Sequence, residues 1–143
     1  MTGISNFKSR RGKVSCKPAE LFRFVTDLRN FRQFIHGNTV EDLQLDKESC
    51  SFLVSPLGNV NVKISEREPD KKVIYTGSAL RSNDFSLLLN IGEDDSGKAE
   101  VMITLDAEMN PVLKMMAAKP VNRFLETLID EMEKFGDWNK VRE

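Results

Sequence analysis

The sequence has few of the residues from which metal sites and histidine-based active sites are built. Its 143 residues include two cysteines and one histidine, and Cys16 and Cys50 stand far apart without a CxxC pair. This set is too small for a recognisable zinc site, so we predict no metal and no cofactor. We expect both thiols to pack as small core hydrophobes without a structural disulfide, since a reducing compartment disfavours one.

Long apolar runs are also missing. No stretch approaches the roughly 20 residues that cross a bilayer, and the first residues lack the apolar centre of a secretory signal. We therefore expect a cytoplasmic protein without a transmembrane segment. With 40% apolar and 30% charged residues, the chain is too apolar for a disordered protein. Its length suits one domain that buries about two-thirds of its unfolded surface.

Charge of one sign does not dominate, because the formal net charge is −1. The distribution is uneven, however, since residues 1–32 hold eight basic side chains against Glu20 and Asp27. Such asymmetry can mark a face for nucleic acid or an anionic membrane. These basic residues lie among apolar ones and are not interleaved with stacking aromatics. We favour a solvated surface paired with acidic neighbours, and we expect no nucleic-acid partner.

The motifs of several common enzyme classes are absent. The sequence has no GxGxxG, GxxxxGKS/T, HExxH or GxSxG motif. No motif therefore indicates nucleotide binding, zinc-dependent proteolysis or the chemistry of a serine hydrolase. His36 is the one candidate for histidine acid–base work, and a cation at a helix end is the simpler interpretation. Asp106 with Glu108, and Glu66 with Glu68, share strand faces. We interpret these carboxylates as charged surface and not as acid–base pairs.

Hydrophobic spacing predicts a strand followed by helices near the start of the chain. Residues 4–16 alternate weakly and read as one strand. Pro18 suits the first position of a helix, although Lys17 is a poor N-cap. Apolar residues then recur at helical spacing over residues 21–35. An interruption at residues 27–30 predicts two short helices, and the segment 36–38 is expected to end them.

From residue 39 the apolar period changes to two, which is typical of half-buried strands. The pattern predicts strands at residues 40–47, 49–55, 60–64, 73–76, 85–91 and 99–107. Turn residues separate them at 56–59, 69–71 and 94–97. The middle of the chain is therefore predicted to be an antiparallel meander.

The end of the chain returns to helical spacing. Asn110 is a good N-cap and Pro111 a good first residue. An apolar stripe then runs along residues 113–135. Pro120 lies inside this stripe and cannot donate to the helical ladder, which predicts a kink or a break there.

Two segments carry a resemblance to a known family. They are the junction Val14-Ser15-Cys16-Lys17-Pro18-Ala19-Glu20-Leu21-Phe22 with the following Thr26-Asp27-Leu28, and Met109-Asn110-Pro111 with the helix after it. With this order of elements, the chain resembles the START-like (SRPBCC) helix-grip superfamily, which includes polyketide-cyclase-like proteins and the birch-pollen allergen. The resemblance covers residues 4–135. It implies that residues 1–143 form one α+β domain, with a curved antiparallel sheet of about seven strands around the long C-terminal helix.

The resemblance also implies a cavity between the sheet and that helix. Our leading hypothesis is that it binds or transports a small hydrophobic or amphipathic ligand, such as a lipid, an isoprenoid or a polyketide-like molecule. The residues expected to form its wall are Phe34, Phe52, Val62, Ile64, Tyr75, Leu87, Leu89, Val101, Ile103, Met116, Phe124 and Leu128. Within this set, the Tyr75 hydroxyl either orients a ligand or packs at the end of the sheet.

Two alternatives stay open at this stage. A polyketide-cyclase-type enzyme would need polar groups that move protons at inward positions, where the sequence offers few, and we assign no catalytic residue. A protein-binding or chaperone-regulating domain would have a filled cavity and an exposed apolar patch. Trp138, after the last apolar turn, either caps the helix end or faces a partner.

Overall fold

The computed structural model describes residues 3–35, 40–54, 58–79, 83–136 and 138. The strands are β1 (Gly3–Lys8), β2 (Gly12–Lys13), β3 (Glu41–Leu45), β4 (Ser49–Val54), β5 (Gly58–Glu68), β6 (Lys72–Ala79), β7 (Asn83–Glu93) and β8 (Ala99–Met109). The helices are α1 (Pro18–Val25), the 3₁₀ helix η1 (Leu28–Gln33) and the long α2 (Pro111–Lys134). The predicted helix end at 36–38 and the first half of the predicted turn at 56–59 lie outside the described residues, and β5 already begins at Gly58.

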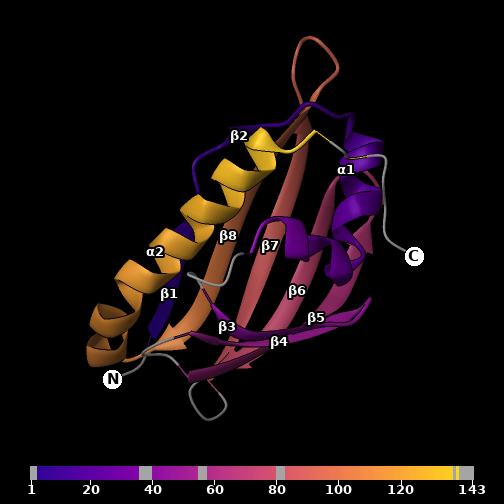
Figure 1. The fold of residues 1–143 in the computed structure, drawn as a ribbon. Helices are drawn as coiled ribbons and strands as arrows, with labels where there is room; N and C mark the ends of the chain where they lie inside the picture. The colour runs from indigo at the N-terminus through magenta and orange to yellow at the C-terminus, as the bar shows by residue number, and fades with distance from the viewer. Residues whose placement is uncertain (1–2, 36–39, 55–57, 80–82, 137, 139–143) are drawn as a thin grey trace.

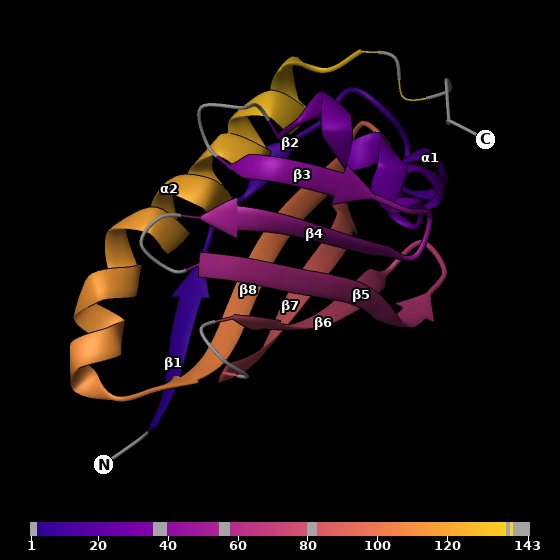
Figure 2. The same ribbon diagram turned by 60° about the horizontal axis from the view of Figure 1, so that its bottom comes forward.

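Within the described residues, all the strands join one antiparallel sheet in the order β1-β8-β7-β6-β5-β4-β3, with β2 also paired to β8. Helix α2 lies across the sheet beside β1 and β8, while α1 lies at the opposite side (Figure 1). Figure 2 shows that the sheet curls, so that β3, β4 and β5 face back towards α2. This arrangement confirms the predicted α+β fold in which a curved sheet grips the last helix.

The alternating pattern of the strands places their apolar residues against α2. Directly paired residues of antiparallel neighbours project to the same face. Leu87 pairs with Tyr75 on one side and with Leu105 on the other, so these three share the inner face. Leu125 and Leu128 of α2 are buried in the same core.

The first predicted strand is divided in two. Ser9, between β1 and β2, is buried, and its hydroxyl donates to the carbonyl of Arg10 at 2.8 Å. The same hydroxyl accepts the backbone N–H of Ile103 at 2.9 Å, in place of a regular ladder bond. Further on, Gly12 permits the close approach of α2, because a Cβ atom there would lie 2.7 Å from Cγ2 of Ile129.

The two short helices after β2 are confirmed, and a carboxylate supports the start of each. The Glu20 side chain accepts the backbone N–H of Lys17 at 3.0 Å, which compensates for the poor N-cap. Asp27 accepts the backbone N–H of Arg29 at 3.0 Å and forms an ion pair with its guanidinium at 2.6 Å. The hydrogen bond from the Arg29 side chain lowers the pKa of Asp27, so this cap is charged at neutral pH.

Helix α2 begins as predicted but is not broken at its proline. The Asn110 side chain accepts the backbone N–H of Leu113 at 2.8 Å, and Pro111 is the first residue. The helix then runs without a break through Pro120. Ala117 and Val121, on either side of this proline, are both buried. Packing of the turns on both sides keeps them in one helix despite the missing N–H donor.

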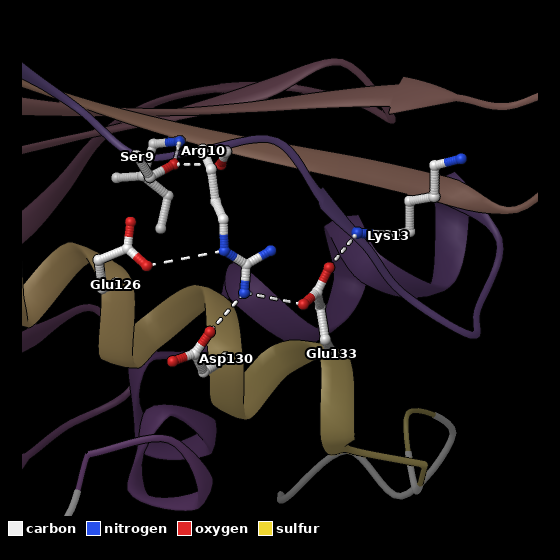
Figure 3. A network of polar contacts seen from close by, with 7 residues as sticks. Ser9, Arg10, Lys13, Glu126, Asp130 and Glu133 are labelled. Atoms are coloured by element: carbon white, nitrogen blue, oxygen red, sulfur yellow. Dashed lines mark hydrogen bonds and ion pairs between the residues drawn. The ribbon is translucent and has the colours of Figure 1, made fainter.

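An ion-pair network fixes the second half of α2 to the connection between β1 and β2 (Figure 3). The Arg10 guanidinium pairs with Glu126 at 3.6 Å, with Glu133 at 2.8 Å and with Asp130. Glu133 also accepts the backbone N–H of Lys13 at 2.9 Å. Basic residues of the first 32 thus meet acidic residues of the last helix, as the surface-pairing interpretation expects.

Aromatic side chains close the end of the core next to α1. Phe24, Phe34, Phe135 and Trp138 contact one another with ring centroids between 4.9 and 5.8 Å apart. The indole Nε1 of Trp138 donates to the carbonyl of Phe135 at 3.0 Å. Trp138 is buried and covers the end of α2, so of its two predicted roles the structure shows the cap. No helix among the described residues is long and apolar enough to cross a membrane.

Candidate functional site

A cavity of about 120 Å³ lies between the inner face of the sheet and α2. The predicted wall residues that line it are Phe52, Val62, Tyr75, Leu87, Leu89, Ile103, Phe124 and Leu128. Their strands, β4 to β8, are neighbours in the sheet, and its curl brings β4 and β5 opposite α2 (Figure 2). Across the cavity the rings of Phe52 and Phe124 stack with their centroids 5.8 Å apart. The sheet and the helix therefore meet at this pair.

Four predicted wall residues lie elsewhere. Phe34 belongs to the aromatic cluster at the α1 end. Val101 is buried beside Gly12, beneath the second half of α2. Ile64 lies at the register shift of β5, where the strand leaves regular pairing with β6. Met116 is 48% exposed, because one residue on a helix turns the side chain by about 100° away from its buried neighbour Ala117.

Further wall residues lay on the predicted apolar faces but were not singled out from the sequence. They are Leu28, Phe31, Ile35, Cys50, Val60, Phe85, Leu105, Ala107, Met109, Leu113, Pro120 and Val121. Helical and strand periodicity identifies the inward face of an element, and it does not identify which inward positions border a void and which touch another side chain.

Gly77, a glycine within β6, is a residue of the site region that the sequence could have indicated. A glycine within a strand pattern often marks the close approach of another part of the chain. A Cβ atom at Gly77 would lie 2.1 Å from the backbone oxygen of Asn61 and 2.7 Å from Cζ of Phe85. The missing side chain makes room for the Phe85 ring on the cavity wall.

The cavity is closed at the η1 end and opens along the first half of α2. At the closed end, Leu28 and Phe31 of η1 are buried. At the other end, Met109, Leu113 and Pro120 line the cavity and are only half-buried. Solvent therefore reaches the cavity where β8 ends and α2 begins.

Among the described residues, two side chains with a titratable polar group line the cavity, Tyr75 and Cys50, and neither is suited to proton transfer near neutral pH. The Tyr75 hydroxyl donates to the carbonyl of Val25 at 2.7 Å, so it is already engaged, and burial raises its pKa. Burial also raises the pKa of the Cys50 thiol, to about 12. Both groups stay neutral and protonated at pH 7. Among the described residues, no metal-binding cluster of His, Cys, Asp or Glu is present.

The other candidate polar groups do not join this cavity. Asp106 and Glu108 lie on the opposite face of the sheet, where Asp106 pairs with Asn6 and Ser86, and they line an open groove of about 910 Å³. Lys63 and several hydroxyl side chains share this groove, which matches the interpretation of these carboxylates as surface groups. His36 lies outside the described residues.

Comparison with known proteins supports the fold and supplies no function. No protein-family model matches the sequence, and no curated protein matches it significantly. A START superfamily protein from Mycobacterium smegmatis matches with a TM-score of 0.61 and 11% identity, over 93% of this chain and 94% of that one. A protein from Rhodobacter sphaeroides matches with a TM-score of 0.67 and 11% identity, over 94% and 97% of the two chains.

A third solved structure is DynU16, a protein of the dynemicin biosynthetic locus. Its TM-score is 0.58 at 11% identity, over 92% of this chain and 46% of DynU16. Sheet, helices and cavity together define a helix-grip protein. The likeness to these structures confirms the resemblance to the START-like (SRPBCC) superfamily at the level of the fold, and at such low identity it extends no further.

Proposed function

We propose that residues 1–143 act as one domain that binds a small hydrophobic or amphipathic ligand in the cavity between the sheet and α2. The observation that carries this proposal is the chemistry of the wall. Its lining side chains are apolar apart from Tyr75 and Cys50, and the Tyr75 hydroxyl is already bonded within the protein. Such a wall favours hydrocarbon and offers no partner to a buried charge or an amide.

The volume limits how much of a ligand fits. An apolar cavity of about 150 Å³ lined by aliphatic and aromatic residues stays dry and binds benzene. The cavity of about 120 Å³ therefore suits one ring or a short branched chain. A larger amphipathic molecule would place its apolar end inside and its polar end at the mouth near Met109 and Leu113. A lipid, an isoprenoid or a polyketide-like molecule can present such an end.

The same wall counts against the cyclase alternative. General acid–base catalysis needs a group within hydrogen-bond reach whose pKa lies near the working pH. The pKa values of Tyr75 and Cys50 are both raised away from neutrality. Ligand binding requires no acid or base, so the composition of the wall favours binding over catalysis.

Thermal shift and native mass spectrometry test the proposal. The panel contains toluene, naphthalene, fatty acids, isoprenoids, sterols and aromatic polyketides. A ligand that binds only the folded state stabilises it by about 2.7 kcal/mol at a hundred times its Kd. At least one compound should raise the unfolding midpoint saturably and remain bound in the mass spectrum. If no compound does either, the cavity is not a binding site and the proposal fails.

A pair of variants on β7 connects the effect with the cavity. Leu87→Arg places a charge in the wall and should abolish the ligand-dependent shift. Leu88→Arg introduces the same side chain on the outer face, where Leu88 pairs with Ile74 and Thr104, and should retain the shift. Equal shifts for the two variants would show that the compounds bind elsewhere.

A further inference from the structure

The first half of α2 carries a cluster of apolar side chains in solvent. Val112 is 68% exposed, Met115 81% and Met116 48%. Among the described residues these are the large hydrophobic side chains with the greatest exposure. They lie within about one turn of each other and therefore form one patch. Protein surfaces usually carry such side chains singly, so a cluster indicates a site of contact with another protein or with a membrane.

Cations continue this patch along the same face of the helix. Lys119 and Arg123 follow Val112 and Met115 at intervals of three and four residues, opposite the buried positions Ala117 and Val121. Lys114 adds a third cation at the helix start. Between Pro111 and Arg123 the helix has no carboxylate, and within the described part of the chain these three cations make no ion pair.

The second half of α2 has the opposite charge. It carries Glu126, Asp130, Glu131 and Glu133 against Lys134, and three of these carboxylates meet Arg10 (Figure 3). The apolar and cationic face therefore ends at Arg123. An anionic surface would attract the first half of the helix and repel the second.

We propose that the face of α2 formed by Val112, Met115, Met116, Lys119 and Arg123 docks on an anionic lipid bilayer. In this arrangement the three apolar side chains enter the boundary between headgroups and acyl chains, and the two cations contact lipid phosphates. We call this set of five residues the docking face. It goes beyond the proposed function, because it concerns a surface and does not require an occupied cavity.

The position of the cavity mouth fits this arrangement. Met109, Leu113 and Pro120, at the mouth, belong to the same part of the chain as the docking face. A bilayer against the docking face therefore lies next to the opening through which a hydrophobic molecule would enter.

A second copy of the chain fits this face less well than a bilayer. In a two-fold pairing of parallel helices through Met115, Lys119 and Arg123 would lie near their own equivalents, and in an antiparallel pairing the first half of α2, which has no carboxylate, would offer them no opposite charge. Like charges at such an interface oppose association. An anionic bilayer provides both an apolar layer and opposite charge.

Vesicle co-sedimentation at low ionic strength tests the docking face. The vesicles contain either phosphatidylcholine alone or one part phosphatidylglycerol to two parts phosphatidylcholine. The protein should bind the anionic vesicles and release them as salt rises, with much weaker binding to the neutral ones. Each cation near an anionic surface contributes roughly a fivefold gain in partitioning. Lys119→Gln with Arg123→Gln should therefore weaken binding about 25-fold.

Matched variants separate docking from general charge and from folding. Lys8→Gln with Lys63→Gln removes two exposed cations from strands outside α2 and should leave vesicle binding close to that of the unchanged protein. Met115→Asp should abolish binding without loss of stability, because the side chain is solvent-exposed. Met115→Trp should bind more tightly, since tryptophan favours the membrane interface.

Three results would overturn the inference. They are absence of binding to anionic vesicles, equal weakening by the Lys8/Lys63 pair, and unchanged binding by Met115→Asp. Light scattering provides a further check. A concentration-dependent dimer that Met115→Asp abolishes would assign the face to a second copy and not to a bilayer. Ligand-dependent thermal shifts are measured without vesicles, so a failure of the binding proposal is distinguishable from a failure of docking.

Discussion

The hydroxyl of Tyr75 donates a 2.7 Å hydrogen bond to the backbone carbonyl of Val25. This bond joins β6 to the last residue of α1, fifty positions apart in the chain. The tyrosine ring lines the cavity, while its one polar atom is directed into the structure around α1. The residue that sequence analysis offered as a ligand-orienting group therefore acts as a connection between the sheet and the helices at its end.

Tyr75→Phe should reduce stability and spare ligand binding. The substitution keeps the ring and leaves the buried carbonyl of Val25 without this donor, which costs about 1–3 kcal/mol. Urea unfolding should show the loss, while the saturable thermal shift by a panel compound should keep its apparent Kd. A variant with normal stability and a weakened Kd would instead show that the hydroxyl contacts the ligand.

Leu128→Ala and Leu125→Ala should differ in cost although both leucines are buried on α2. Leu128 borders the cavity and Leu125 does not. A buried Leu→Ala change costs roughly 2–5 kcal/mol, and the cost rises with the contacts that the neighbours lose. We expect Leu128→Ala near the lower end of this range and Leu125→Ala above it by urea unfolding. The reverse order would indicate that side chains fill the space beside Leu128.

The sequence predicted which face of each helix or strand is buried better than it predicted where each element ends and which distant residues it contacts. Alternation in β7 and β8 placed Leu87, Leu89 and Ile103 on the cavity wall, because strand periodicity depends on burial of one face. The division of the first strand at Ser9 could not be foreseen, since it depends on the Ser9 hydroxyl bonding to Ile103, ninety-four positions away. Long-range bonds of this kind leave no local pattern.

The sequence alone also could not identify every residue of the cavity wall. Met116 and Ala117 are adjacent and both apolar, yet α2 buries the second and exposes the first. An apolar stripe with residues on several sides of a helix does not fix which side faces the sheet. The outward methionine is the residue that sequence analysis assigned to the wall, and the structure places it on the docking face.

Alkaline pH should destabilise the protein through its two thiols. Burial raises the pKa of Cys16 and of Cys50 from 9.0 to about 12 in the folded state. Below about pH 9 both states hold these protons and the thiols cause no pH dependence. Above it the unfolded chain loses them first, so stability falls as pH rises towards 12, by at most about 1.4 kcal/mol per pH unit for each thiol.

Urea unfolding under reducing conditions between about pH 8 and pH 11 measures this slope. Cys50→Ala should flatten it below about pH 10, because one of the two thiols is gone. Above about pH 10 the buried Tyr75, whose raised pKa depends in part on Cys50, also contributes to the slope, so the two proteins are compared below that pH. Identical slopes with and without Cys50 would show that its thiol ionises as readily in the folded protein as in the unfolded chain.

Arg10→Gln should loosen the second half of α2 at neutral pH and have little effect in acid. Arg10 bonds to Glu133 and Asp130, and its side-chain hydrogen bond is the largest cause of the lowered pKa of Glu133. A carboxyl group with a lowered pKa stabilises the fold above its ordinary pKa of 4.5 and loses that contribution as pH falls. The difference in Tm between the two proteins should therefore shrink from about pH 7 to about pH 3. Amide exchange in the last turns of α2 should be faster in the variant at the higher pH.

Lys13→Gln is the matched control, because Lys13 contacts Glu133 through its backbone N–H and the bond survives the substitution. If Lys13→Gln changes amide exchange as much as Arg10→Gln does, the loss of positive charge and not the bonds of the guanidinium holds the helix in place.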